Sequence, residues 1–480
     1  MRRFWRHLAA FFAGTLAIGG FHPFELWFFP LISLIMVIRI VAHESLASRS
    51  ILFYLYGLGF LGPLLHWSST YVGAVPWIIL TLGFSAFYIL LAFAFIDRKL
   101  SPALFVLLFI ASEGLRAIVP FGGFGWGRFG FSQLGGPFAE WLRIGGVALA
   151  GGAVAASAAL LSSLSRRSLV VLPLFLIGTL GIVPANAATQ NEPIRIGLVQ
   201  GGVSQLGLDF NATPEEVFRR HFSETEVLLS RHSVDIVLWP ENASDIDPTT
   251  TIRLRDQLHE IADRNKTPLV IGAVTQSVNG PENVSLLFDG NGGVPSRYQK
   301  RDLVPFGEYV PLRGIASFFS PLVEEVRDFV PGETISTHQI AGIEFAPLIC
   351  YEILDDRVAW ENLVRSDFGV VQTNNATFGK SWQSGQQFQM TRVRAFESQI
   401  PFVVAATTGD TALIDRNGQT LERLTKYESG HLVVDIQPHR AIRPWIAPEA
   451  LLYLSFLVIV GIYLWNYRSH IRRRFALRRY

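Results

Sequence analysis

The chain contains a single cysteine, Cys350, whose surroundings suit a reactive thiol. The apolar run 345–349 precedes it and predicts a strand, and the polar, acidic segment 352–357 follows directly. A thiol at a strand terminus, beside a carboxylate, is placed as a nucleophile at the edge of a sheet. The alternative is that Cys350 is a small buried hydrophobic residue, the more frequent role of free cysteine.

A candidate base, Glu241, follows the apolar run 234–239 and Pro240. A glutamate directly after a buried strand lies at a sheet edge, where a partly desolvated carboxylate can accept a proton. The alternative is an acidic residue that starts a helix or lies in a solvated loop.

A candidate cation, Lys300, begins a segment in which two prolines, a glycine and aromatic residues alternate with charges, residues 300–311. This composition predicts a fixed loop that can hold an ammonium near a reacting carbonyl. Lys300 and Glu308 can equally form a surface ion pair of little energetic value. Glutamate, lysine and cysteine together suit acyl transfer, in which a base activates the thiol and a cation stabilises the oxyanion.

The composition is that of a membrane protein. Half of the 480 residues are hydrophobic, 17% are charged, and the mean hydropathy is +0.32. Soluble domains carry about 25% charged residues. The net charge of +2 indicates no nucleic-acid partner, and one cysteine excludes an internal disulfide framework. No Cys/His pattern predicts a metal site.

Long apolar runs predict eight membrane spans, most of them near the roughly 20 residues needed to cross a bilayer. They lie near residues 8–24, 27–42, 50–67, 76–96, 101–119, 143–162, 168–186 and 447–467. Arginines and lysines fall in alternate loops and at both termini, so both termini are predicted to be cytoplasmic.

Three regions follow from this pattern. Residues 1–190 form a membrane domain with about seven spans, 191–440 an extracytoplasmic α/β domain, and 441–480 a last span and a basic cytoplasmic tail. In the α/β domain, helices are predicted near 214–229, 252–264 and 383–397. Strands are predicted near 194–200, 234–239, 269–274, 284–288, 345–349, 368–372, 402–406 and 411–415.

The three chemical segments resemble, in order and form, the Glu-Lys-Cys triad of the nitrilase superfamily. With eight spans around them, the chain resembles the apolipoprotein N-acyltransferase family, and Leu303-Val304-Pro305-Phe306-Gly307-Glu308 is the most specific match. The resemblance implies a multi-span α-helical domain joined to a nitrilase-like αββα sandwich.

The resemblance also implies roles for individual residues. Glu241 matches the general base, Lys300 the oxyanion-stabilising lysine and Cys350 the nucleophile. Glu308 matches a glutamate that orients the lysine. Further matches are two residues beside the nucleophile and an aromatic beside the base, namely Tyr351, Glu352 and Trp239.

The activity implied is transfer of an acyl chain from a phospholipid to the α-amine of a diacylglyceryl-modified apolipoprotein at the bacterial cytoplasmic membrane, without cofactor or metal. The chain departs from the family pattern in two segments, Asn374-Asn375-Ala376-Thr377-Phe378-Gly379 and Thr407-Thr408-Gly409-Asp410. The resemblance therefore does not fix the details of the substrate loops or the preferred acyl donor. Two alternatives are a membrane-tethered amidase or nitrilase acting on a small amide, and a non-catalytic scaffold for a polyprenol-phosphate mannosyltransferase.

Overall fold

The computed structural model describes the chain except residues 97, 164–191, 315–316, 318–326, 341 and 478–480. Contacts divide the chain into two compact units. The helical unit comprises Met1–Leu65, Ile78–Val183 and Pro444–Tyr480, and the α/β unit comprises His66–Trp77 and Pro184–Arg443.

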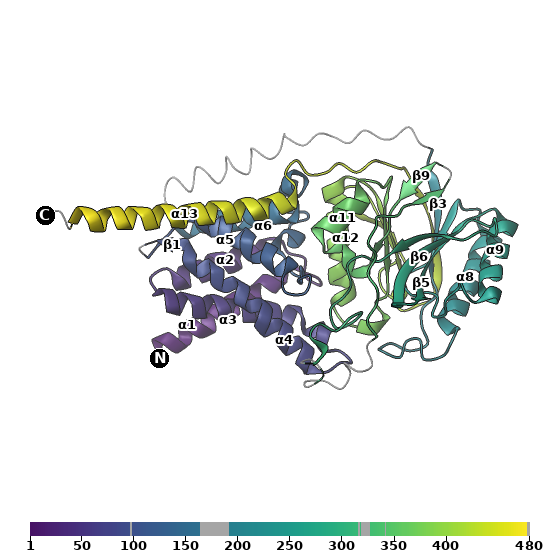
Figure 1. The fold of residues 1–480 in the computed structure, drawn as a ribbon, viewed down its shortest axis with the longest axis horizontal. Helices are drawn as coiled ribbons and strands as arrows, with labels where there is room; N and C mark the ends of the chain where they lie inside the picture. The colour runs from purple at the N-terminus through teal and green to yellow at the C-terminus, as the bar shows by residue number, and fades with distance from the viewer. Residues whose placement is uncertain (97, 164–191, 315–316, 318–326, 341, 478–480) are drawn as a thin grey trace. The chain divides into compact units, whose positions relative to one another are not determined.

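Apolar helices make up the helical unit (Figure 1). They are α1 (Arg2–Leu16), α2 (Phe28–Val41), α3 (Leu46–Leu64), α4 (Ala74–Ser85) with its continuation η3 (Ala86–Ala94), α5 (Pro102–Ile118), α6 (Glu140–Ser163) and α13 (Pro448–Leu477). Within the described residues, Ala74–Ala94 and Glu140–Ser162 are long and apolar enough to cross a membrane. The span predicted near 168–186 lies outside the described residues, so the eight-span domain stays a prediction.

Two glycines allow α1 and α3 to pack closely. A side-chain carbon on Gly14 would lie 1.9 Å from the Tyr56 carbonyl oxygen, and one on Gly59 would lie 1.9 Å from that of Phe11. Only glycine avoids these clashes, which is how small residues bring helix backbones together in apolar surroundings.

The α/β unit contains two sheets. The six-stranded sheet has the order β15-β3-β4-β5-β6-β7, and the five-stranded sheet has the order β10-β11-β12-β13-β14. The strands of the first are β3 (Ile194–Gln200), β4 (Ile236–Leu238), β5 (Leu269–Ser277), β6 (Gly280–Phe288), β7 (Ser296–Gln299) and β15 (Gly430–Ile436). Those of the second are β10 (Leu348–Ile349), β11 (Gly369–Thr373), β12 (Phe402–Ala406), β13 (Ala412–Ile414) and β14 (Thr420–Arg423).

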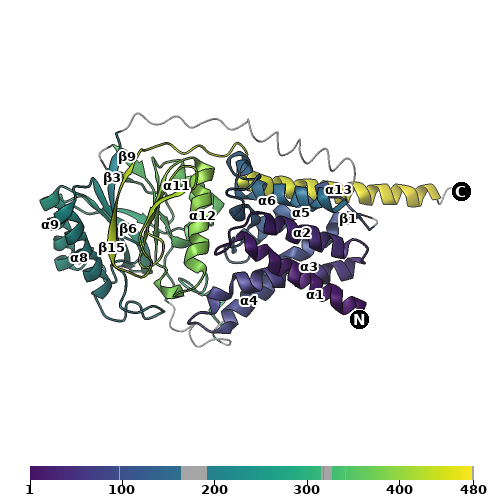
Figure 2. The ribbon, with the colours of Figure 1, turned by 180° about the vertical axis from the view of Figure 1, so that it is seen from behind.

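Helices cover the outer faces of both sheets. Figure 1 and the reverse view in Figure 2 show α8 (Glu216–Arg231) and α9 (Ile252–Asn265) over one sheet. They show α11 (Asp356–Leu363) and α12 (Gln383–Ser398) over the other. The four-layer αββα sandwich predicted for this region is therefore confirmed.

Side chains of alternating direction build the core. Ile236 and Leu238 of β4 pack between the two sheets, whereas Val237 packs under α8 and α9. Successive residues of a strand point to opposite faces, so a strand in the middle of four layers is apolar throughout. This is why β4 was recognisable as an uninterrupted apolar run.

The single strand predicted over 345–349 is wrong in detail. The structure has β9 (Ile343–Phe345), paired with β8 (His338–Ile340), and then β10, paired with β11. Ala346 and Pro347 separate them, since proline has no N–H to give to a ladder. The nucleophile candidate therefore follows a strand of only two residues.

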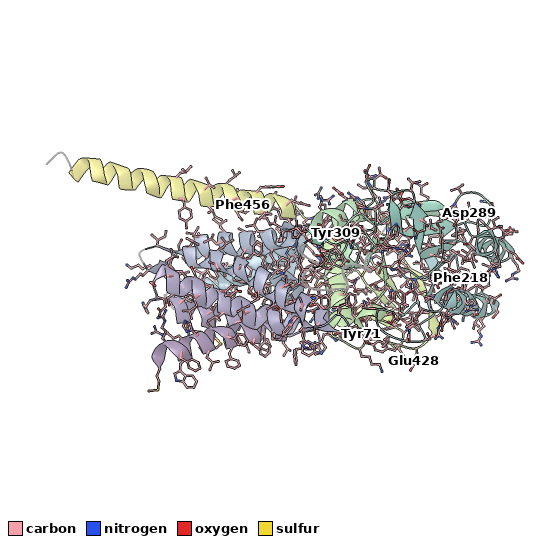
Figure 3. The ribbon with its side chains drawn as sticks, turned by 60° about the horizontal axis from the view of Figure 1, so that its bottom comes forward. Tyr71, Phe218, Asp289, Tyr309, Glu428 and Phe456 are labelled. Atoms are coloured by element: carbon pink, nitrogen blue, oxygen red, sulfur yellow. The ribbon has the colours of Figure 1, made fainter. Side chains whose placement is uncertain are left out.

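The 66–77 segment joins α3 to α4 but packs within the α/β unit. The Trp67 indole N–H donates to Gln386 Oε1 at 3.1 Å. The Trp67 ring also meets Phe378 edge-on, with centroids 5.2 Å apart. Tyr71, labelled in Figure 3, lies against Gly207 and Gly379.

Candidate active site

Lys300 occupies the centre of a buried charge cluster. It directly follows β7, and its backbone N–H donates to the Asn283 carbonyl at 2.9 Å. Its Nζ lies 3.2 Å from Glu241 Oε1 and 2.9 Å from the Glu308 carboxylate. Burial disfavours the ammonium, but the two carboxylates outweigh this effect and hold the pKa of Lys300 well above its usual range. The lysine is therefore a permanent cation at physiological pH.

Glu241 reaches Lys300 because of a close backbone approach between two strands. A side chain on Gly272 of β5 would meet the Pro240 carbonyl oxygen at 2.2 Å, so glycine is needed there. Glu241 is 4% exposed, and its Oε2 accepts the Asn374 backbone N–H at 2.8 Å. The carboxylate is thus fixed from both sides.

Glu308 is held by its own loop. Its Oε2 accepts the Val304 N–H at 2.8 Å, and the backbone of Phe306 is left-handed, with φ of 64°. The Phe306 N–H donates to the backbone carbonyl of Tyr309, a residue labelled in Figure 3, at 2.7 Å and closes the turn. The fixed loop predicted from the prolines and glycine is what holds this second glutamate.

Cys350 lies where β10 ends and a turn of 3₁₀ helix begins. Its φ is 52°, a left-handed conformation that is uncommon for any residue but glycine and often found at functional sites. The thiol is buried, and burial together with the Glu241 charge raises the pKa of Cys350 to about 12, against an opposing effect of Lys300. Since the resting sulfur is a thiol, it needs a base before it can attack.

Glu352 ties the lysine loop to the cysteine turn. Its Oε1 accepts from the Tyr298 hydroxyl at 2.9 Å and the Arg301 N–H at 2.7 Å, and its Oε2 accepts from the Ile349 N–H at 2.8 Å. One fully buried carboxylate therefore fixes the chain immediately before Cys350 and immediately after Lys300.

Two other predicted site residues are placed differently. Tyr351 is buried beside Cys350 in the 3₁₀ turn. The Trp239 indole instead packs against Phe218 and His221 of α8, and its N–H donates to Thr225 at 2.7 Å. Figure 3 labels Phe218, on the helix that covers the sheet. The backbone carbonyl of Trp239 accepts from Gln372 Nε2 of β11 at 2.7 Å.

Two residues in the site were not found in the sequence. Asn283 donates to Glu241 Oε1 at 2.8 Å and to Glu308 Oε1 at 2.7 Å. Gln387 of α12 places its Nε2 3.6 Å from the Cys350 sulfur. Neither stands beside a recognisable motif, so only the pairing of β6 with its neighbours and the docking of α12 reveal them.

The arrangement combines a thiol, a carboxylate able to take its proton, and a cation for a developing oxyanion. These are the parts required for acyl transfer through a covalent intermediate. Among the described residues, no group of three His, Cys, Asp or Glu side chains is placed to hold a metal ion.

Comparison with known proteins covers both units. Residues 13–160 match the family model described as the apolipoprotein N-acyltransferase N-terminal domain, and residues 195–445 match the carbon-nitrogen hydrolase model. A Mycolicibacterium smegmatis protein named apolipoprotein N-acyltransferase is 31% identical, over 95% of this chain and 84% of its own length. A Pseudomonas aeruginosa protein of the same name is 30% identical, over 92% and 91%.

The chain was also compared with solved structures. An amidase of the nitrilase superfamily from Nesterenkonia is 21% identical, with a TM-score of 0.40, over 54% of this chain and 94% of its own.

Proposed function

Because this chain belongs to the apolipoprotein N-acyltransferase family, we propose that Cys350 carries a phospholipid acyl group as a thioester and passes it to an amine. The chain is an acyltransferase of lipoprotein maturation. The acceptor is the free α-amine of the diacylglyceryl-modified cysteine that begins an apolipoprotein. The observation that carries the proposal is the Glu241–Lys300–Glu308 cluster beside the single cysteine of the chain.

In the first half-reaction, Glu241 takes the thiol proton and the Cys350 sulfur attacks an ester carbonyl of the phospholipid. The tetrahedral intermediate collapses by breaking the carbon–oxygen bond of the ester. Glu241 returns the proton to the departing alcohol, so the products are a lysophospholipid and the thioester. A buried base is needed because the pKa of the thiol is about 12.

In the second half-reaction, the lipoprotein α-amine attacks the thioester. Glu241 takes a proton from the nitrogen, an amide forms, and the sulfur leaves and regains that proton. An amide is more stable than a thioester, so this transfer is downhill without an added energy source. No step requires a metal or a cofactor.

Lys300 serves both half-reactions by facing the oxyanion of each tetrahedral intermediate. Glu308 and Asn283 hold the ammonium and the base in position, because Glu308 accepts from Lys300 and Asn283 donates to Glu241. Loss of one oxyanion-stabilising group typically costs about 10²–10³ in rate.

The membrane topology forms part of the same proposal. Residues 1–190 would hold about seven spans and 441–480 the eighth, with the catalytic domain, 191–440, on the outer face of the cytoplasmic membrane. The charge pattern supports this orientation, because Arg39, Arg49 and the basic termini fall on one side. Both substrates are lipids, which accounts for a membrane-embedded enzyme.

The test is transfer of a labelled acyl chain from phospholipid to a diacylglyceryl-cysteine peptide by the purified full-length protein. Wild type should form an acyl-enzyme that neutral hydroxylamine cleaves, and Cys350→Ala should form none. Cys350→Ser should turn over far more slowly, because a hydroxyl is a poor nucleophile at its ordinary pKa.

An acyl adduct on Cys350→Ala would overturn the assignment of the nucleophile. Release of free fatty acid alone, or cleavage of small amides with the peptide untouched, would favour a tethered hydrolase.

A further inference from the structure

Gln387 lies in the second turn of α12 with its side chain directed at the nucleophile. Its Nε2 is 3.6 Å from the Cys350 sulfur, a hydrogen-bonding distance for sulfur. Gln387 is 3% exposed, so solvent does not compete for either end of the amide. Glutamine in the middle of a buried helix face needs a polar environment, and the catalytic sulfur is part of it.

The orientation of this amide follows from its oxygen. Three donors converge on Gln387 Oε1, from Asn375 Nδ2 at 2.8 Å, Thr373 Oγ1 at 3.2 Å and Gln383 Nε2 at 3.2 Å. An oxygen surrounded by donors directs the amide nitrogen to the opposite side. The N–H group therefore faces the sulfur.

The neighbours of the sulfur have opposing effects on it, and a hydrogen bond with the Thr373 side chain lowers the pKa of Cys350 as Lys300 does. Glu241 is negative and opposes a second negative charge on Cys350, while burial removes the water that would solvate a thiolate. Lys300 offsets this effect, but two carboxylates already share its charge. A donor from α12 adds a contact that favours the thiolate and does not depend on the charge cluster.

We propose that Gln387 is a further catalytic residue, whose side-chain N–H donates to the Cys350 sulfur and stabilises the thiolate. The inference rests on the proposed role of Cys350 as the nucleophile. In the first half-reaction the bond supports the attacking sulfur after Glu241 takes its proton. In the second it supports the same sulfur as the leaving group. Gln387 exchanges no proton in either step.

The single cysteine makes the proposal directly measurable. In the full-length protein, every S-carbamidomethyl cysteine formed by iodoacetamide lies at Cys350. The rate constant of alkylation is measured between pH 6.5 and 9. The temperature is kept well below the unfolding midpoint of each variant. Below the pKa of the thiol, this rate follows the thiolate fraction, moderated by the nucleophilicity of the sulfur.

Gln387→Met keeps the approximate length and removes both amide functions. We expect alkylation about three- to tenfold slower at each pH, with a similar fall in kcat for acyl transfer and little change in KM for phospholipid. Gln387→Glu keeps an acceptor for Asn375, Thr373 and Gln383 but places an acidic group against the sulfur. Its alkylation should be slower still.

The matched control is Thr391→Val on the same helix. Thr391 lines the same small cavity as Gln387, but its hydroxyl donates to the Gln387 backbone carbonyl at 3.1 Å and not to sulfur. It should keep the wild-type alkylation rate.

Unchanged or faster alkylation in folded Gln387→Met would refute the donor role and leave the proposed function intact. If Gln387→Met does not fold, Gln387→Glu decides by the same criterion. Transfer activity surviving in Cys350→Ala would instead remove the nucleophile assignment, whatever the alkylation rates.

Discussion

Asn283 donates its two side-chain N–H groups to the two carboxylates of the candidate site, Glu241 and Glu308. Glu241 Oε1 and Glu308 Oε1 each accept from Asn283 Nδ2 and from Lys300 Nζ, so donors and acceptors alternate around the four groups. The amide nitrogen of Asn283, which carries two hydrogens, lies toward both carboxylates. Two negative charges can lie this close only because a cation and a neutral donor separate them.

Asn283→Asp tests this arrangement with almost no change of shape. It replaces two donors by a third carboxyl group, and we expect acyl transfer to fall at least about 100-fold. Initial rates of transfer measure the effect, and the thermal unfolding midpoint shows whether the variant is folded. Asn291→Asp is the matched control, since Asn291 is exposed, and it should retain full activity. A folded Asn283→Asp enzyme within about threefold of wild type would contradict the role.

Sequence analysis predicted the site residues that belong to a recognisable motif. It missed the site residues that are identified only by their contacts in the folded protein. Glu241, Lys300 and Glu308 follow strands or turn residues that are visible in the sequence, and the structure brings them together. Asn283 lies inside a strand, and nothing in its neighbours distinguishes it from an ordinary polar strand residue. The packing of Trp239 away from the charge cluster was equally invisible, because it depends on α8.

The β8–β9 hairpin is attached to the six-stranded sheet through a buried histidine. His338 Nε2 lies 3.1 Å from the Ser285 hydroxyl, and Nδ1 lies 2.9 Å from the Ser296 hydroxyl. One ring thus connects β8 with β6 and β7. Burial lowers the pKa of His338 to about 4, so the ring is neutral in the folded protein.

This histidine makes stability depend on pH. Its folded pKa lies below the unfolded value of about 6.5, so its contribution is present above pH 6.5 and is lost as pH falls towards 4. The loss amounts to about 3 kcal/mol, at 1.36 kcal/mol for each pKa unit.

We therefore expect His338→Gln to be less stable than wild type at pH 7, with the difference narrowing as pH falls to 4. Denaturant unfolding followed by tryptophan fluorescence measures it. His232→Gln, at an exposed position, should keep the wild-type pH dependence. A parallel pH dependence in wild type and His338→Gln would show that this ring does not titrate on unfolding.

Strands with a clear run of apolar residues could be predicted from the sequence. Strands that are defined mainly by pairing with a neighbouring strand could not. The predicted bounds 194–200 and 402–406 coincide with β3 and β12, both of which are buried throughout or nearly so. The edge strand β14, exposed along its whole length, carries no apolar pattern and was not predicted. The break between β9 and β10 was missed because the two short strands form one continuous apolar run.

At the scale of the whole molecule, the predicted orientation places the α/β unit outside the cytoplasmic membrane. We expect Ser233→Cys, in a Cys350→Ser background, to react with a membrane-impermeant maleimide in intact spheroplasts. Ser233 is exposed, so an unreactive side chain there would indicate a membrane barrier and not burial. Ala47→Cys in the same background is the control. Ala47 is exposed at the start of α3, between two predicted spans on the side predicted to be cytoplasmic, and it should react only after permeabilisation.

The placement of the 66–77 segment bears on the order in which the protein is made. The bond from Trp67 to Gln386 joins residues 319 positions apart. At about 5–20 residues per second, the ribosome needs roughly 15–60 s to reach the second residue after the first. During that time Trp67 has no Gln386 to bind. The α/β unit can therefore be completed only after both the 66–77 segment and α12 have been synthesised. A fragment limited to residues 184–443 would therefore be synthesised without a side chain that its own α12 is built to receive.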